Sequence, residues 1–229
     1  MTDFILQFGS LAVTLIVYYI NKKIYKRYPR LLLMPLLLTP AVLISIILAS
    51  SLPWHDYIGE SHWLLWLLGP ATIAFAVPVY ENTRMIRKHW LSITTGVFTA
   101  IIVASTSSVW LARALELPDE LQRTLVVRSV TTPFALSAVQ TFGGQPDLAA
   151  FFVALTGVCG FAVGDFIFLR LAIRSGGAIG AGFGAASHGA GTARSYQLGQ
   201  EQGVVASLVM MLSGILMVIG SPLLKSLLF

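Results

Sequence analysis

Long apolar runs separated by short polar turns dominate the sequence. An apolar run of about twenty residues is long enough to cross the hydrocarbon core of a bilayer as a helix. The pattern predicts helical segments at residues 4–20, 31–50, 63–81, 91–113, 122–141, 148–171, 178–198 and 204–225. We therefore expect an all-α, polytopic membrane protein with 7–8 transmembrane segments, formed by residues 1–229 as a single integral membrane domain.

The composition agrees with this expectation. Hydrophobic residues make up 56% of the 229 positions and charged residues 11%, whereas roughly a quarter of the residues of a soluble domain are charged. The formal net charge of +5 does not indicate nucleic-acid binding, because many of the basic residues cluster in two short loops. Basic loops stay in the cytoplasm, so we place residues 21–30 and 83–89 inside.

The first apolar run is expected to be a retained span. A signal peptide carries its basic residues before the apolar run, whereas here Asp3 precedes the run and Lys22 and Lys23 follow it.

Metal, redox and catalytic sites are not expected. Cys159 is the single cysteine and cannot form a disulfide framework within the chain. The four histidines lack the spacing of metal ligands. Ser187 and His188 are neighbours, which on a helix point about 100° apart and do not face each other. We therefore expect no cofactor, no metal and no enzymatic reaction.

The positive-inside rule conflicts with eight simple crossings, which would place Arg170 and Arg174 outside the cell. If residues 122–141 instead form a re-entrant hairpin, both arginines and Lys225 return to the cytoplasm. We expect this second arrangement.

Three segments contain residues that interrupt a helix inside the membrane. The first holds Pro70 and Pro78, and each proline leaves the carbonyl four residues earlier without its N–H partner. Lipid cannot replace that hydrogen bond, so protein, water or a ligand must do so. The same segment contains Gly69, Thr72 and Glu81.

The second interruption sets Arg128 beside three hydroxyl groups, those of Ser129, Thr131 and Thr132, and before Pro133. The hydroxyls can satisfy freed backbone groups by themselves, which is a purely structural interpretation. An ionised arginine at bilayer depth costs ~2.5–3.5 kcal/mol on insertion scales unless it reaches the surface. Arg128 is therefore a functional candidate.

The third interruption contains nine glycines between residues 176 and 203. Each glycine costs a helix up to about 1 kcal/mol relative to alanine, although small residues also let membrane helices pack closely. Close packing does not require the polar residues Ser187, His188, Thr192 and Arg194 that lie in the same segment.

Two opposed broken helices form the substrate site of many secondary transporters, and segments 69–80 and 184–194 are the predicted inverted pair. Arginine binds a carboxylate with two parallel hydrogen bonds, so Arg128 and Arg194 indicate a small organic anion as the substrate. The predicted substrate-binding residues are Gly69, Pro70, Thr72, Arg128, Ser129, Thr131, Thr132, Ser187, His188, Gly189, Gly191, Thr192 and Arg194.

Three titratable residues are candidates for proton coupling, namely His188, Asp165 and Glu81. A lone membrane histidine is more often a hydrogen-bonding contact between helices. Asp165 can pair with an arginine instead of relaying protons.

Three ordered motifs resemble the signatures of the LrgB/CidB family of bacterial inner-membrane proteins. They are LLGPATIAFAVPVYEN, then RSVTTPFAL followed by FGGQPDLAAFFVALTGVCG, and then GAASHGAGTARSYQLGQEQGVVASL. The resemblance extends from about residue 30 to the C-terminus. It departs at Asp165, where the family pattern has proline.

The resemblance implies two alternative functions. One is a secondary transporter or exporter of small monocarboxylates or hydroxycarboxylates, of the glycolate, pyruvate and 3-hydroxypropionate class. The other is a holin/antiholin-like regulator of murein hydrolase activity and cell lysis. Both imply a multi-pass protein of the bacterial inner membrane that acts with a small membrane protein of the LrgA/CidA type, and we also expect a homo-oligomer.

Overall fold

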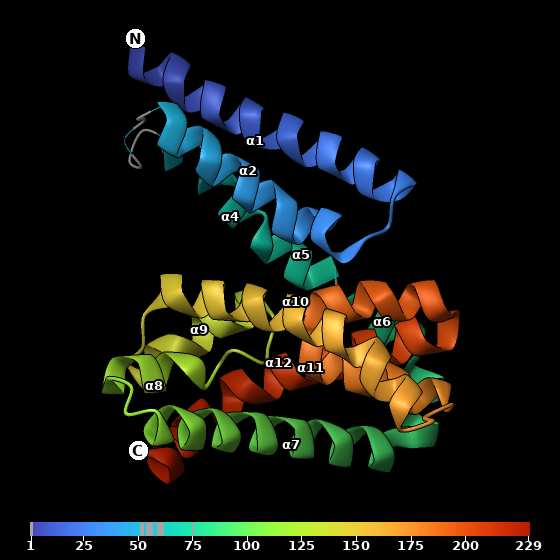
Figure 1. The fold of residues 1–229 in the computed structure, drawn as a ribbon. Coiled ribbons are helices and arrows are strands. Elements are labelled where there is room, and N and C mark those ends of the chain that lie inside the picture. The colour runs from blue at the N-terminus through green and yellow to red at the C-terminus, as the bar shows by residue number, and fades with distance from the viewer. Residues whose placement is uncertain (1, 51–52, 54–56, 59–61, 75) are drawn as a thin grey trace. The chain divides into compact units, whose positions relative to one another are not determined.

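The computed structural model describes residues 2–50, 53, 57–58, 62–74 and 76–229, and every regular element in these ranges is a helix (Figure 1). The all-α prediction is therefore confirmed for the described residues. The chain divides into two compact units, Met1–Ala71 and Thr72–Phe229. The single domain over residues 1–229 stays a prediction.

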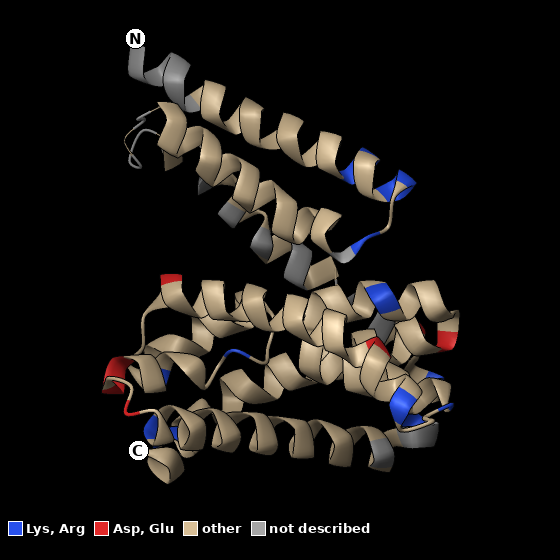
Figure 2. Cartoon of the chain, in the orientation of Figure 1, with Lys and Arg blue, Asp and Glu red and all other residues tan. Residues whose placement is uncertain are grey.

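The first unit is built on two helices that pack side by side. Helix α1 (Thr2–Arg27) is followed by the 3-10 helix η1 (Leu31–Leu33) and by α2 (Pro35–Ser50). A buried hydrogen bond of 3.2 Å from Asn21 Nδ2 to Thr39 Oγ1 joins α1 to α2. Figure 2 shows the basic residues of this unit gathered around the turn between the two helices, as the predicted inside loop requires.

The third predicted segment is divided into three short helices: α4 (His62–Trp66), α5 (Leu68–Ala74) and α6 (Ala76–Glu81). Pro70 occupies the third position of α5, where the missing N–H costs no internal hydrogen bond. The break between α4 and α5 at Leu67 is therefore an interruption of the kind that the sequence predicts. Residue 75, between α5 and α6, lies outside the described residues.

The second unit contains three long apolar helices. They are α7 (Thr83–Ala114), α10 (Pro146–Arg170) and α12 (Gln200–Leu228). In α7 the apolar part is Ile93–Ala114, 22 residues long, and α10 and α12 have 25 and 29 residues. Among the described residues, these three helices are long and apolar enough to cross a membrane. The predicted number of 7–8 spans stays a prediction.

Between α7 and α10 the chain forms a hairpin, named here the first hairpin. It consists of α8 (Asp119–Leu125), an irregular turn and α9 (Thr132–Phe142). Its two ends are tied together, because Gln145 Nε2 donates to Glu120 Oε1 at 2.7 Å and Gln145 N donates to Thr124 Oγ1 at 3.0 Å. The first hairpin therefore begins and ends at the same end of the second unit.

Helix α11 (Gly176–Leu198) reverses its direction at His188, which has φ 36° and ψ −116°. A methyl group on Gly191 would collide with the carbonyl oxygen of Phe183, eight residues earlier. In a straight helix these residues would be about 12 Å apart. The two arms of α11 therefore fold back on each other.

Both ends of α11 lie near the start of α12. Gly176 lies against the side chain of Glu201, and Gly203 lies against the ring of Tyr196. We name residues 176–198 the second hairpin. The interruption predicted within segment 178–198 is present, as a turn of the backbone at His188.

The two hairpins start from opposite ends of the second unit. Lys225 Nζ donates to the carbonyl of Thr141 at 2.8 Å, and Arg113 Nη2 donates to the carbonyl of Leu228 at 2.5 Å. The last turns of α7 and α12 therefore lie at the end where α9 finishes, while the second hairpin starts at the other end, next to Arg174. Within the second unit Lys225 and Arg174 lie at opposite ends, and the predicted membrane side of each stays a prediction.

Glycines account for the close approach of the second hairpin to its neighbours. A methyl group on Gly184 would lie 2.9 Å from the Cα of Ala206 in α12, and one on Gly160 of α10 would collide with the hydroxyl of Ser187. A methyl group on Gly189 would meet nothing within 4 Å. The structural interpretation of the glycine-rich segment, close packing, therefore applies to some of its glycines.

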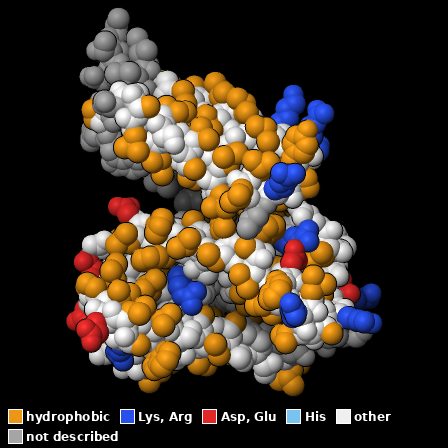
Figure 3. All heavy atoms as spheres, viewed as in Figure 1, with side chains coloured by type: hydrophobic (Ala, Val, Ile, Leu, Met, Phe, Trp, Pro, Cys, Tyr) orange, Lys and Arg blue, Asp and Glu red, His pale blue; other side chains and the backbone are white. Residues whose placement is uncertain are grey.

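The core of the second unit lies where α7, α9 and α12 meet the turn of the first hairpin. Its members are largely apolar and fully or nearly fully buried, and they include Val97, Val127, Val139, Phe142, Leu208 and Met217. On the outside, Figure 3 shows hydrophobic side chains spread over both units, and Figure 2 shows charged residues mainly near helix ends. Such a surface suits lipid better than water.

Candidate functional site

Arg128 lies in the turn of the first hairpin, inside the second unit. Val126 and Val127 are fully buried and Val130 is 2% exposed, and these valines fix the turn in the core. The Nε atom of Arg128 donates to the hydroxyl of Ser108 on α7 at 2.8 Å. In the part of the chain that the structure describes, no hydrogen bond or ion pair uses its Nη1 or Nη2. Arg128 therefore keeps two donors for a ligand.

A cavity of about 740 Å³, the Arg128 cavity, opens beside this guanidinium. The first hairpin contributes Arg128 and Ser129 to its wall, and the second hairpin contributes small residues: Ala181, Gly182, Ala185 and Ala186. Because these side chains are small, the second hairpin leaves space next to the positive charge. The cavity is large enough for a small anion together with water.

Three hydroxyl-bearing residues of α7 also line this cavity: Thr95, Thr99 and Ser107. Sequence reasoning missed them, although Thr95 and Thr99 are four residues apart and therefore lie on one face of a helix. That periodicity within an apolar helix was the available signal.

The turns of the two hairpins meet beside Arg128. His188 Nε2 lies 3.2 Å from the carbonyl oxygen of Arg128, and His188 is 4% exposed. Its ring is enclosed by α10, since a methyl group on Gly157 would be 3.3 Å from Cε1. Both residues are predicted binding residues, and the contact between them joins the histidine ring to the main chain of Arg128. His188 thus makes the kind of hydrogen-bonding contact that is the more common role of a lone membrane histidine.

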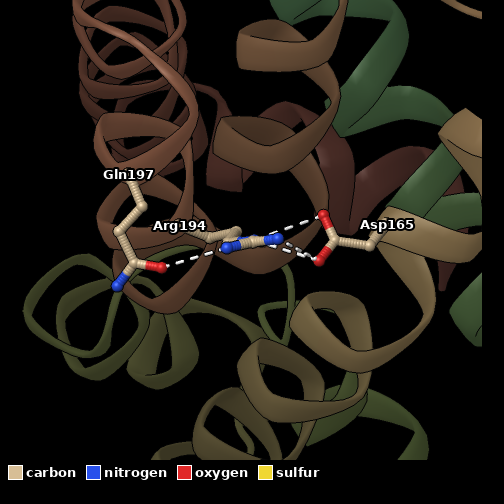
Figure 4. A network of polar contacts seen from close by, with 3 residues as sticks. All are labelled: Asp165, Arg194 and Gln197. Atoms are coloured by element: carbon tan, nitrogen blue, oxygen red, sulfur yellow. Dashed lines mark hydrogen bonds and ion pairs between the residues drawn. The ribbon is translucent and has the colours of Figure 1, made fainter. Parts of the chain in front are cut away.

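Arg194 lies on the second arm of α11 and already holds a carboxylate (Figure 4). Its Nη2 is 2.8 Å from Asp165 Oδ2, and its Nε donates to Oδ2 at 3.0 Å and to Oδ1 at 3.3 Å. Nη1 donates to Gln197 Oε1 at 3.1 Å. The sequence left two alternatives for Asp165, proton relay and pairing with an arginine. In the structure Asp165 pairs with Arg194.

Arg128 and Arg194 are therefore not brought together around one ligand. Arg194 is absent from the described residues that line the Arg128 cavity. A substrate carboxylate at Arg194 would have to displace Asp165. The geometry consequently favours Arg128 as the anion site and Arg194 as a tie between α10 and the second hairpin.

Charge exchange tests this tie. Arg194→Asp should destabilise the protein by about 1 kcal/mol, because two carboxylates then face each other in a partly exposed position. Asp165→Arg combined with Arg194→Asp should recover at least half of that loss. Thermal unfolding in detergent measures both variants, and a double variant no more stable than Arg194→Asp alone would contradict the role of the pair.

The other predicted binding residues are spread over several contacts. Thr192 donates to Met210 Sδ at 3.6 Å, and the hydroxyls of Ser187 and Thr131 are buried with no partner among the described residues. Thr132 begins α9. Gly191 packs against Phe183, as above.

The predicted residues of the 69–80 segment are divided between the two units. Gly69 and Pro70 belong to the first unit and Glu81 to the second. The side chain of Thr72 lies outside what the structure describes. The predicted crossing of segments 69–80 and 184–194 therefore stays a prediction. No group of three or more possible metal ligands occurs among the described residues.

The fold and the site define a membrane protein whose described elements are helices, with two hairpins that meet at a half-buried arginine. Residues 14–227 match the model of the LrgB-like family. The chain therefore belongs to the LrgB-like family, as the three motifs indicated.

Similar proteins cover nearly the whole chain. The uncharacterized protein YwbG of Bacillus subtilis is 36% identical over 217 residues, which are 95% of this chain and 96% of that protein. The uncharacterized protein YxaC of the same species is 30% identical over 90% of both chains. The holin-like protein CidB of Staphylococcus epidermidis is 26% identical over 98% of both chains. No solved structure matches the chain.

Proposed function

We propose that this protein is a secondary carrier of small monocarboxylates or hydroxycarboxylates, and that Arg128 binds the carboxylate. The observation that carries the proposal is the guanidinium of Arg128, which has two unused donors in a cavity where two opposed hairpins meet. Guanidinium binds carboxylate with short, charge-assisted hydrogen bonds. A buried anion site without such a cation would be costly in a membrane.

The two hairpins supply the architecture that a carrier needs. Irregular backbone at membrane depth is tolerated where it is covered by protein or lines a water-filled cavity. In the turn of the first hairpin Val126, Val127 and Val130 are buried. Arg128 and Ser129 of the same turn line the Arg128 cavity. We propose that the first hairpin is re-entrant from one side of the membrane and the second hairpin from the other. This pair, residues 119–142 and 176–198, replaces segments 69–80 and 184–194 as the proposed inverted pair.

Charge distribution supports an orientation. The end of the second unit where α7 begins and α11 starts carries five basic residues, Arg84, Arg87, Lys88, Arg170 and Arg174, and two acidic ones, Glu81 and Glu201. The opposite end combines Arg113, Arg123 and Lys225 with four acidic residues: Glu116, Asp119, Glu120 and Asp147. By the positive-inside rule the first end faces the cytoplasm of a bacterial inner membrane.

Glycolate, pyruvate and 3-hydroxypropionate are the proposed substrates. Each has one carboxylate for Arg128 and a second oxygen that the hydroxyls of Thr99 or Ser107 can approach. A small LrgA/CidA-type membrane protein and further copies of this chain are the proposed partners, and the proposed activity is transport without an enzymatic reaction.

A holin-like regulator of cell lysis is the second candidate, and the names of the staphylococcal CidB relatives favour it. A holin-like protein acts by oligomeric pore formation. It would release solutes of many kinds without saturation, and it would tolerate substitutions at Arg128.

Counterflow in proteoliposomes separates the two candidates. Vesicles loaded with unlabelled glycolate should take up external labelled glycolate transiently, with saturation and with competition by pyruvate and 3-hydroxypropionate. An enclosed fluorescent dye of larger size should stay inside. Dye release together with non-saturating glycolate flux would overturn the carrier and favour the holin-like alternative.

A further inference from the structure

A second cavity continues from the Arg128 cavity toward the end of the second unit where α11 and α12 begin. Its volume is about 300 Å³, and we name it the Glu201 cavity. Residues of α7, α11 and α12 line both cavities, namely Gly96, Ala181 and Val209. The two cavities are therefore neighbours along one route between Arg128 and this end of the unit.

Glu201 lines the second cavity next to Ser175 and Gly177. Its carboxylate lies over the first turn of α11, since a methyl group on Gly176 would be 3.1 Å from Oε2 and one on Gly177 would be 4.0 Å from Oε1. The positive end of a helix dipole favours a negative charge there. The side chain is exposed, so its charge faces the route.

Among the described residues that line the two cavities, Arg128 and Glu201 are the charged ones. Glu201 and Val209 are eight residues apart on α12, which corresponds to about 12 Å along the helix axis. An anion of the size of glycolate that is bound at Arg128 therefore does not touch Glu201. The field of Glu201 acts over this distance both on the anion bound at Arg128 and on anions that pass.

We propose that Glu201 is a charge filter on the route to Arg128, and that it favours singly charged over doubly charged carboxylates. The inference rests on the proposed carrier function. A dianion meets about twice the repulsion that a monoanion meets at Glu201, while both find the same single guanidinium at Arg128. Cavity walls of low polarity strengthen the field that a passing ion experiences.

Glu201→Gln tests the filter in equilibrium exchange of labelled glycolate, with unlabelled malonate present on both sides of the vesicle membrane at a pH that ionises both malonate carboxyls. The malonate concentration for half-inhibition should fall about three- to tenfold. The glycolate concentration for half-saturation should fall by only about the square root of that factor, because a monoanion meets half the repulsion. Glu201→Asp keeps the charge and should behave like the unmodified protein.

Asp147→Asn is the matched control, because Asp147 is an exposed carboxylate in the first turn of α10, at the opposite end of the unit. It should leave the ratio of malonate to glycolate inhibition unchanged. A second measurement needs no variant: raising the ionic strength should improve malonate relative to glycolate, since salt screens the exposed Glu201 more than the half-buried Arg128.

The filter would be overturned if Glu201→Gln changed half-inhibition by malonate and half-saturation by glycolate by the same factor, or changed neither. It would also be overturned if the ratio of these two concentrations did not depend on salt. These outcomes differ from failure of the proposed function, in which the unmodified protein shows no saturable glycolate exchange at all.

Discussion

Replacing Arg128 by glutamine should reduce glycolate counterflow about a hundredfold. The variant loses the guanidinium that faces the Arg128 cavity, and hydrogen bonds to a charged group contribute about 1.5–3 kcal/mol each. Each 1.36 kcal/mol corresponds to a factor of ten. Arg128→Lys should retain part of the activity, because an ammonium group keeps the charge but loses the planar pair of donors. Initial rates of counterflow below saturation measure both variants.

Arg174→Gln is the matched control for this experiment. Arg174 is an exposed arginine in the turn between α10 and α11, and its loss should leave counterflow within about twofold of the unmodified protein. Thermal unfolding in detergent checks that Arg128→Gln is folded. Counterflow in a folded Arg128→Gln protein that equals that of Arg174→Gln would contradict the assignment of Arg128.

Gly184→Ala should destabilise the protein by about 2 kcal/mol. The added methyl group would lie 2.9 Å from the Cα and 3.0 Å from the carbonyl carbon of Ala206, which belong to the backbone of α12 and cannot rotate away. Overpacking of this kind costs about 1–3 kcal/mol. The second hairpin would have to move away from α12, so the exchange rate should fall as well. Thermal unfolding in detergent measures the first effect and counterflow the second.

Gly189→Ala provides the control within the same helix. A methyl group at Gly189 meets nothing within 4 Å, and alanine is a better helix former than glycine by up to about 1 kcal/mol. This variant should be as stable as the unmodified protein or slightly more stable. Equal destabilisation by the two substitutions would mean that general helix flexibility, and not contact with α12, explains the glycines.

The sequence predicted the helical class and the places where helices are interrupted. Pro70, Arg128 and His188 lie at or near the breaks that the structure contains, because a missing N–H or a charge in an apolar run can be read from the sequence alone. The direction of the chain after a break is not visible in this way. Whether α11 continues or folds back at His188 depends on contacts such as the one between Gly191 and Phe183.

The assignment of two arginines to one site illustrates a second limit. Arg128 and Arg194 have the same chemistry and similar sequence surroundings, so sequence reasoning grouped them. In the structure Asp165 approaches Arg194 from α10, whereas Arg128 has Ser108 and an open cavity. Which arginine keeps unused donors is decided by neighbours that are distant in the chain.

Site protection in a single-cysteine protein tests the carboxylate site most directly. In a Cys159→Ser background, Ser107→Cys places a thiol in the wall of the Arg128 cavity, while Thr106→Cys places one on the neighbouring exposed position of α7, outside the described lining of that cavity. Glycolate should slow the reaction of the thiol at position 107 with N-ethylmaleimide, and the neutral analogue glycolamide should not. The thiol at position 106 should react at the same rate in all cases. Equal reaction rates at position 107 with and without saturating glycolate would contradict a carboxylate site at Arg128.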